Sequence, residues 1–207
     1  MIDNTCAPRV ARILKGWLPA LCLSLAACAG GQPNVKTAPV EVHQPVKVGE
    51  GMDVFALNYT PWYIHTFSIQ GPPGSRIGGG GPNVQPVGPY GGPSGGGKAV
   101  CCMSYPAEWR PDLTFTVRWL VEKKKPDGKV WGYWYKAENV RIAQYNGGNA
   151  GAAWGIFLPG DRVRIMITDG NRDGGNNPNN RPADNDPYIA QGVLDEEWNR
   201  LYPPAHD

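Results

Sequence analysis

Apolar residues alternate with polar ones over several short runs of this chain, which is the pattern of β-strands that bury one face. The run 114–122 shows it most clearly, because Phe115, Val117 and Trp119 take every second position with polar side chains between them. Gly, Pro, Asn and Asp separate such runs, as they do in antiparallel sheets. We predict strands at Val54–Tyr59, Tyr63–Ile69, Ala99–Tyr105, Thr114–Glu122, Lys129–Val140, Trp154–Leu158 and Arg162–Thr168.

The turn signals between these runs favour a mainly β fold. The segment Pro126–Gly128 stands between two of the runs and predicts a β-hairpin. Short strands in this number predict a single antiparallel β-sandwich or an open, barrel-like domain. A Gly/Pro-rich insert at 71–98 and an Asn/Asp-rich segment at 170–187 form long loops, and a short C-terminal helix is expected at about 189–201.

The first 27 residues have the features of a cleaved lipoprotein signal peptide. Basic residues precede an apolar run that ends in Leu25-Ala26-Ala27-Cys28, and this run has about half the roughly 20 residues that span a bilayer. The ending resembles a lipobox, whose cysteine takes a diacylglycerol before cleavage on its amino side. We therefore expect cleavage between Ala27 and Cys28, lipid on Cys28, a tether over 28–51 and a β-rich domain over 52–207.

The charge of the mature chain excludes some classes of partner. The chain has 20 Lys and Arg and 18 Asp and Glu, and the signal peptide holds three of the former and one of the latter, which leaves 17 of each. Without a basic field, we expect no nucleic-acid partner, and contact with the membrane only through the lipid on Cys28. Ala29, not an aspartate, follows the cysteine, so retention in the inner membrane is not indicated.

Two segments in or next to the Gly/Pro-rich insert match the sequence patterns of active-site motifs but lack the other features that those motifs require. The segment Gly92–Ala99 is similar to a phosphate-binding loop, yet no Ser or Thr follows Lys98, and a strand is expected next instead of a helix. The segment Gly92–Gly96 has the Gly-x-Ser-x-Gly pattern, but the later histidine, His206, stands next to the C-terminus. We expect no nucleotide, no cofactor and no catalytic residue, and hence a protein that is not an enzyme.

Oxygen-bearing side chains alternate after the last predicted strand. Asp169, Asn171 and Asp173 precede Gly174 as in the first half of a calcium loop, but Asn180 stands where a bidentate Glu belongs. An ordinary Asn/Asp/Gly turn is the simpler interpretation. We expect no resident metal and keep the first three residues only as a candidate calcium site.

Cys101 and Cys102 are neighbours in the sequence and have no other cysteine to pair with, because Cys6 and Cys22 leave with the signal peptide and Cys28 carries lipid. Adjacent Cα atoms lie about 3.8 Å apart, below the usual disulfide window of roughly 4.4–6.8 Å. Two alternatives remain open, a strained vicinal disulfide and two buried thiols. A buried or structural role is favoured over a redox-active one, since free Cys is among the most buried residue types.

The run Trp131–Tyr135 places aromatic side chains on both faces of one predicted strand. One face must pack in the core, and the other is available to solvent or to a partner. Exposed aromatic residues are typical anchors of interfaces, so Trp131, Tyr133 and Trp134 are the candidate partner-binding residues. A strand that is covered on both faces of the sandwich is the alternative.

Five motifs follow one another in a characteristic order along the chain. They are Asn58-Tyr59-Thr60, Tyr63-Ile64-His65-Thr66-Phe67-Ser68-Ile69, the Gly-rich stretch into Val100-Cys101-Cys102, Leu113-Thr114-Phe115-Thr116-Val117-Arg118-Trp119, and Phe157-Leu158-Pro159-Gly160-Asp161-Arg162-Val163-Arg164. Together they resemble the family called domain of unknown function 3304, lipoproteins of Gram-negative bacteria. The resemblance covers roughly Val54 to Thr168, and the insert at 71–98 is longer here and richer in proline.

The resemblance implies a function that composition alone does not. Members of the family are similar to immunity lipoproteins encoded beside lipase effectors of type VI secretion systems, which would place this protein on the outer membrane, facing the periplasm. We expect a non-enzymatic protein that binds such a phospholipase. The alternative is a structural or accessory envelope lipoprotein that binds peptidoglycan, glycan or a component of a secretion apparatus.

Overall fold

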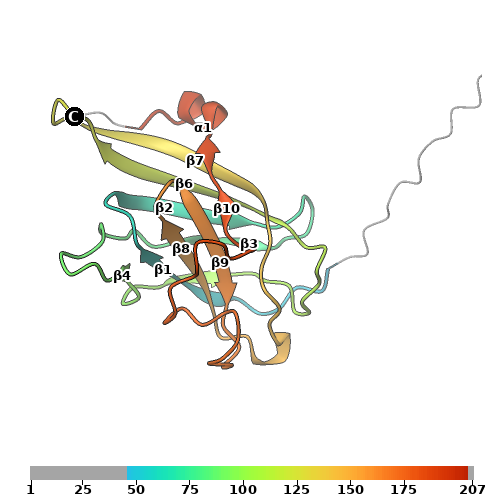
Figure 1. Cartoon of the computed structure of the whole chain (residues 1–207). Helices are drawn as coiled ribbons and strands as arrows, with labels where there is room; N and C mark the ends of the chain where they lie inside the picture. Colours follow the sequence, from blue (N-terminus) through green and yellow to red (C-terminus); the bar gives the residue numbers. More distant parts are fainter. Residues whose placement is uncertain (1–45, 205–207) are drawn as a thin grey trace, which may run out of the picture. The chain divides into compact units, whose positions relative to one another are not determined.

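Two β-sheets pack face to face in the domain, and a computed structural model describes its residues 46–204 (Figure 1). The first sheet has the strand order β10-β9-β8-β1-β4, with β5 also paired to β1, and the second has the order β11-β7-β6-β2-β3. The elements are β1 (Met52–Asn58), β2 (Tyr63–Gln70), β3 (Gly78–Gly81), β4 (Ser94–Gly95), β5 (Val100–Met103), β6 (Phe115–Lys124), β7 (Val130–Val140), a 3-10 turn η1 (Gly147–Asn149), β8 (Ala152–Leu158), β9 (Arg162–Ile167), β10 (Ala190–Gln191), β11 (Val193–Leu194) and α1 (Glu196–Leu201).

The predicted fold class is confirmed. Each of the runs with alternating apolar residues forms a strand, and β6 and β7 are joined as a hairpin across Pro126–Gly128. The sheets form a sandwich and do not close into a barrel. One strand pair departs from the antiparallel pattern, because β1 and β8 run parallel along their length.

The core lies between the two sheets and is made by the inward positions that the alternation marks. Phe115, Val117 and Trp119 of β6 are almost wholly buried there, and Trp119 stacks on Tyr135 of β7 with ring centroids 5.7 Å apart. The ring of Phe67 fills the space above Gly81 and Gly155, where an added Cβ would collide with it. Two glycines therefore shape the core as much as the apolar side chains do.

Four short strands lie outside the predicted runs. The strand β3 is four consecutive glycines and β4 is Ser94–Gly95, so neither contains an alternation of apolar and polar residues. The other two, β10 and β11, occupy the first part of the predicted C-terminal helix, whose N-terminal boundary at 189 is therefore wrong. The helix begins at Glu196 because Asp195 caps it, with its carboxylate accepting a hydrogen bond from the Trp198 N–H at 3.2 Å.

The folded domain begins earlier than the predicted boundary at residue 52. The Gly49 N–H donates to the Tyr105 carbonyl, and the Ala107 N–H donates to the Lys47 carbonyl, both at 2.8 Å. The segment from Lys47 onward is therefore part of the domain and not of the tether. The predicted signal peptide, the cleavage site at Ala27 and Cys28, and the rest of the tether lie outside the described residues. Between residues 46 and 204, no helix has the length and apolar character that crossing a bilayer requires.

The outer face of the first sheet carries a second apolar cluster, in which Ile156, Leu158 and Met166 are buried. The Asn/Asp-rich segment at 170–187 is held in place by Arg164 of β9, whose side chain is only 2% exposed. Arg164 pairs with Asp186 at 3.0 Å and donates to the Gly175 carbonyl at 2.6 Å. Burial lowers the pKa of Arg164, and the neighbouring Asp186 opposes that shift.

Candidate functional site

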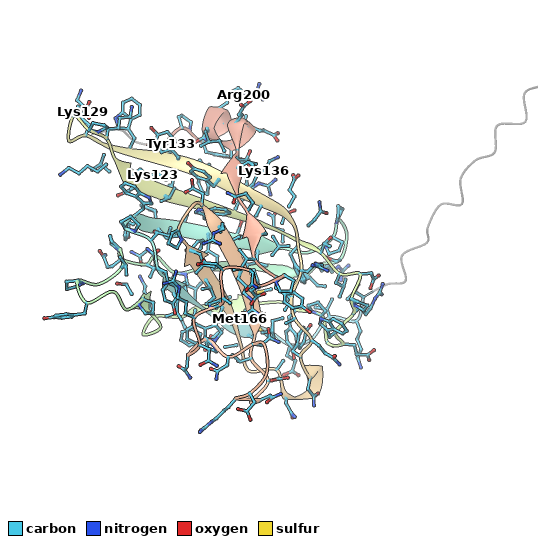
Figure 2. The ribbon with its side chains drawn as sticks, in the orientation of Figure 1. Lys123, Lys129, Tyr133, Lys136, Met166 and Arg200 are labelled. Atoms are coloured by element: carbon cyan, nitrogen blue, oxygen red, sulfur yellow. A yellow bond between two sulfur atoms is a disulfide. The ribbon has the colours of Figure 1, made fainter. Side chains whose placement is uncertain are left out.

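The β6–β7 hairpin projects beyond the strands on either side of it. The ladder between β2 and β6 begins at the pair Tyr63–Glu122, and β11 pairs with β7 only at Tyr135 and Lys136. Residues 123–131 consequently form a two-stranded tip, and Figure 2 shows Lys129 at its far end. The turn is held by the Asp127 carboxylate, which accepts a hydrogen bond from the Lys129 N–H at 3.0 Å.

The helix α1 packs on β7 through one asparagine. The side chain of Asn199 accepts a hydrogen bond from the Trp134 N–H and donates one to the Trp134 carbonyl, both at 2.9 Å. The Trp134 indole N–H donates to the Tyr202 carbonyl at 3.0 Å, and its ring meets Trp198 edge to face. Asn199 therefore takes the place of a strand at the edge of β7 and fixes the position of the helix.

A buried carboxylate ties the start of α1 to the sheet. Asp195 is 1% exposed and pairs with Arg118 of β6 at 2.9 Å. Arg118 also donates to the Gln70 side chain at 2.7 Å, and its guanidinium lies 5.1 Å from the centre of the Trp198 ring. This network orders the C-terminal residues that follow it.

Exposed apolar side chains gather on β7, β11 and α1. Among the described residues, the large apolar side chains exposed elsewhere are Val48 and Tyr90. A central group of apolar residues with charged neighbours is the usual composition of a protein interface. We call Val130, Val193, Leu201 and Tyr202 the β7–α1 surface. Leu194 is also exposed, but it pairs with Tyr135 and faces the other side of the sheet.

Cationic side chains surround this surface. Figure 2 shows Lys129 on the hairpin, Lys136 on β7 and Arg200 on α1. Lys123 lies nearby and binds Asp161 at 2.7 Å and the Tyr135 hydroxyl at 2.8 Å. Burial lowers the pKa of Lys123, but these hydrogen bonds outweigh it and hold the pKa above its ordinary value. Lys123 is thus a structural ammonium, whereas Lys129 is exposed.

The aromatic residues predicted to bind a partner are largely covered. Tyr133 packs against the core cluster, Trp134 lies beneath α1, and the Lys125 ammonium sits 3.3 Å from the centre of the Trp131 ring. The strand is therefore covered on both faces, which was the alternative interpretation. Apart from Val130 at the start of β7, the exposed apolar residues of this region come from β11 and the end of α1, where the sequence predicts one longer helix.

The oxygen atoms of the candidate calcium site face the backbone. The Asp169 carboxylate accepts hydrogen bonds from the N–H groups of Asn146 and Asn171, at 2.9 and 3.0 Å. The Asn171 side chain accepts one from the Asp173 N–H at 3.2 Å. Within residues 46–204, no cluster of three His, Cys, Asp or Glu side chains with the spacing of a metal site is present. The geometry is that of an Asn/Asp turn.

Cys101 and Cys102 are joined as a vicinal disulfide on β5. Of the two alternatives, the structure has the disulfide, and the alternative of two buried thiols is wrong because both residues are exposed. They stand where the ladder between β1 and β5 shifts register, between the pairs Met52–Met103 and Val54–Val100. The bulge turns both side chains out of the sandwich, because a strand without it would point one of them inward.

Ser94 of the Gly-x-Ser-x-Gly pattern lies in β4, which pairs with β1. Its hydroxyl donates to the Pro86 carbonyl. The lysine of the phosphate-loop pattern, Lys98, donates to the Asn83 side chain at 2.6 Å. Neither pattern adopts the strand–turn–helix context that its chemistry requires.

The family described as protein of unknown function (DUF3304) has a sequence model that matches residues 57–165. The chain belongs to this family. The DUF3304 match begins at the end of β1 and ends within β9, and it leaves β11 and α1 outside. The β7–α1 surface therefore combines a family strand with elements beyond the matched region. No curated protein and no solved structure matches the chain.

Proposed function

We propose that this DUF3304 protein is a non-enzymatic lipoprotein of the cell envelope that binds a protein partner through the β7–α1 surface. The observation that carries the proposal is the concentration of exposed apolar side chains on β7, β11 and α1. Each fully covered apolar side chain contributes about 1.5–3 kcal/mol, so a few of them suffice for a specific complex.

The partner we propose is a phospholipase effector of a type VI secretion system, with this protein as its immunity factor. The sequence resemblance supports this choice, and so does the architecture. A blocking protein needs a rigid scaffold and an ordered contact surface, and the Asp195–Arg118 pair and the Asn199 contacts order α1 on the sheet.

Two exposed tyrosines allow a matched test of the surface. Tyr202 is 57% exposed on the β7–α1 surface, and Tyr90 is 99% exposed in the Gly/Pro-rich insert. In cells that express a periplasm-directed effector encoded beside the gene, Tyr202→Ala combined with Leu201→Ala should abolish protection, whereas Tyr90→Ala should protect like the wild type. Loss of an interface anchor costs about 2 kcal/mol or more, which weakens binding roughly 30-fold.

The outcome that refutes the immunity role is equal killing with and without the wild-type protein. If the wild type protects and the double variant at Leu201 and Tyr202 protects equally well, the immunity role stands and the β7–α1 surface is not the contact surface. Purified variants should unfold within about 0.5 kcal/mol of the wild type, because the replaced side chains are exposed.

The proposed location rests on the lipobox ending at Cys28. Replacing Cys28 by Ser should move the protein from the membrane fraction to the soluble periplasmic fraction, because one thioether carries the lipid. Membrane association that survives the substitution would refute the anchor.

A further inference from the structure

A cavity of about 960 Å³ lies at the end of the second sheet opposite the hairpin tip. Phe115, the first residue of β6, lines it, while the last residue of β6, Lys124, belongs to the tip. A strand of this length spans about 30 Å, which separates the cavity from the hairpin tip. The β7–α1 surface comes closer, because Val193 pairs with Lys136, two residues from Glu138, but no residue of that surface lines the cavity. The lining comprises Val46, Val48, residues 71–76, Arg110, residues 112–116, Glu138 and Asn139.

The cavity has an apolar floor. Leu113 and Phe115 belong to the core, at 7% and 3% exposure, and close the bottom of the cavity. Val48, Pro72 and Pro73 of the lining are more accessible. The accessible apolar part of the lining has room for one apolar side chain of a ligand.

A β-bulge turns polar groups toward the cavity. The pairing of β6 with β7 shifts between Phe115–Val140 and Val117–Ala137, so Glu138 and Asn139 together oppose Thr116. Asn139 has a φ of 56°, in the left-handed region. Bulges recur beside binding sites because they re-aim side chains, and backbone conformations of this kind persist where the surrounding structure holds them.

A second left-handed residue, Arg76, lines the opposite side. Its φ is 58°, and the loop before it is held by hydrogen bonds from the Gly71 N–H to the Ile77 carbonyl and from the Ser75 N–H to the Pro72 carbonyl, both 3.0 Å. A residue other than glycine in this conformation costs about 1–2 kcal/mol. The fold thus holds an arginine at the cavity in a position where glycine would be easier to accommodate.

The charged side chains that line the cavity differ in whether they form an ion pair. Arg110 pairs with Asp112, and Glu138 pairs with Lys136 at 3.2 Å. The guanidinium of Arg76, in contrast, has no hydrogen bond or ion pair with another residue in the range 46–204. Arg76 is therefore the cation of this lining that remains for an anionic group of a ligand.

We propose that this cavity binds a short peptide with a free C-terminal carboxylate. Its volume lies in the range of about 300–1,000 Å³ that small-ligand sites occupy. The carboxylate pairs with Arg76, the peptide groups bond to Thr114, Thr116 and Asn139, and an apolar side chain packs on the floor. A protein C-terminus and a peptidoglycan stem peptide share this chemistry.

The test is a titration of the mature protein, labelled with ¹⁵N, with the tripeptide Ala-Leu-Ala in its free-carboxylate and C-terminal amide forms. We expect shifts of the amide resonances at residues 71–76, 112–116 and 138–139 with the carboxylate form. The amide form should bind about tenfold more weakly, because it loses one charge-assisted hydrogen-bonded pair. The all-L and all-D tripeptides separate the two sources, since stem peptides end in D residues.

The variant Arg76→Gln should bind both forms equally and about tenfold more weakly than the wild type binds the carboxylate form. Arg172→Gln removes an exposed arginine outside this cavity and should bind like the wild type. Binding of either enantiomer that depends on both the carboxylate and Arg76 supports the proposal. It is overturned if neither enantiomer shifts these resonances, or if the amide form or Arg76→Gln binds as tightly as the carboxylate form does to the wild type.

Discussion

The two ends of the β6–β7 ribbon are built in different ways. At the hairpin tip the ladder is regular, the turn contains a glycine, Gly128, with a φ of 87°, and Val130 is exposed among lysines. At the other end the ladder is interrupted by the bulge at Glu138 and Asn139, and a cavity opens. The protruding end needs only regular strand pairing and a well-formed turn. The concave end needs a backbone that departs from regular strand geometry.

The strongest test of this contrast is the substitution Asp195→Ala. It removes the ion pair to Arg118 and the cap of α1, so the free energy of unfolding should fall by about 3 kcal/mol. Denaturant unfolding measures this fall, and the proposed partner should no longer bind. The matched control is Glu138→Ala, which breaks an exposed pair at the cavity end and should cost less than about 0.5 kcal/mol. Equal losses in the two variants would show that α1 does not depend on its buried anchor.

The turn of the hairpin provides the next test. No atom lies within 4 Å of the position that a Cβ on Gly128 would take, so Gly128→Ala introduces conformational strain without a steric clash. We expect a loss of about 1 kcal/mol in the free energy of unfolding, measured by denaturant titration. Gly97→Ala is the control, since this glycine also has open space and does not have a positive φ. Similar losses for both glycines would mean that the left-handed turn is not needed.

At the cavity end, a substitution is expected to stabilise the fold instead of destabilising it. Arg76→Gly should raise the free energy of unfolding by several tenths of a kcal/mol to about 1 kcal/mol, because glycine adopts a φ of 58° without strain. Arg76→Ala keeps the strain and should leave stability unchanged, while both variants lose the peptide. Thermal unfolding of the two proteins side by side separates strain from ligand binding. A destabilised Arg76→Gly protein would show that the arginine serves the fold and not the cavity.

The smallest expected effect is a pH dependence at the hairpin end. The pKa of Lys123 in the folded protein lies above its unfolded value, so the stabilisation from its charge is complete below about pH 10 and is lost as the pH rises through the folded pKa. Because Lys123 is partly exposed, we expect only a few tenths of a kcal/mol. The difference in stability between the wild type and Lys123→Met should shrink above pH 10, and Lys129→Met should show no such change. A difference that stays constant to pH 12 would contradict this account of the Asp161 contact.

Much of the fold follows from the sequence because alternating burial leaves a visible pattern. The strand β6 is the clearest case, since its buried side chains are all apolar and the side chains between them include Arg118 and Glu122. The strand β3 could not be predicted, because four glycines carry no pattern and the strand forms where Phe67 needs the space. The same limit applies to β10 and β11, whose two-residue pairings depend on distant strands.

The candidate sites were harder to predict than the fold. An aromatic run in the sequence marks a strand with large side chains, but whether they are exposed depends on what packs over them, here α1 on Trp134. Arg76 offered no signal at all, because its left-handed backbone arises from loop hydrogen bonds and not from its residue type. One signal was available: Asp195 precedes Glu196 and Glu197, which is the composition of a helix start.

The most direct measurement is hydrogen exchange of the protein with and without the proposed phospholipase partner, followed by mass spectrometry. The proposed function predicts slower exchange in peptides that cover residues 130–136 and 193–202, with little change at 71–98 or 138–139. Protection confined to the Gly/Pro-rich insert or the cavity, with the β7–α1 surface exchanging as in the free protein, would contradict it.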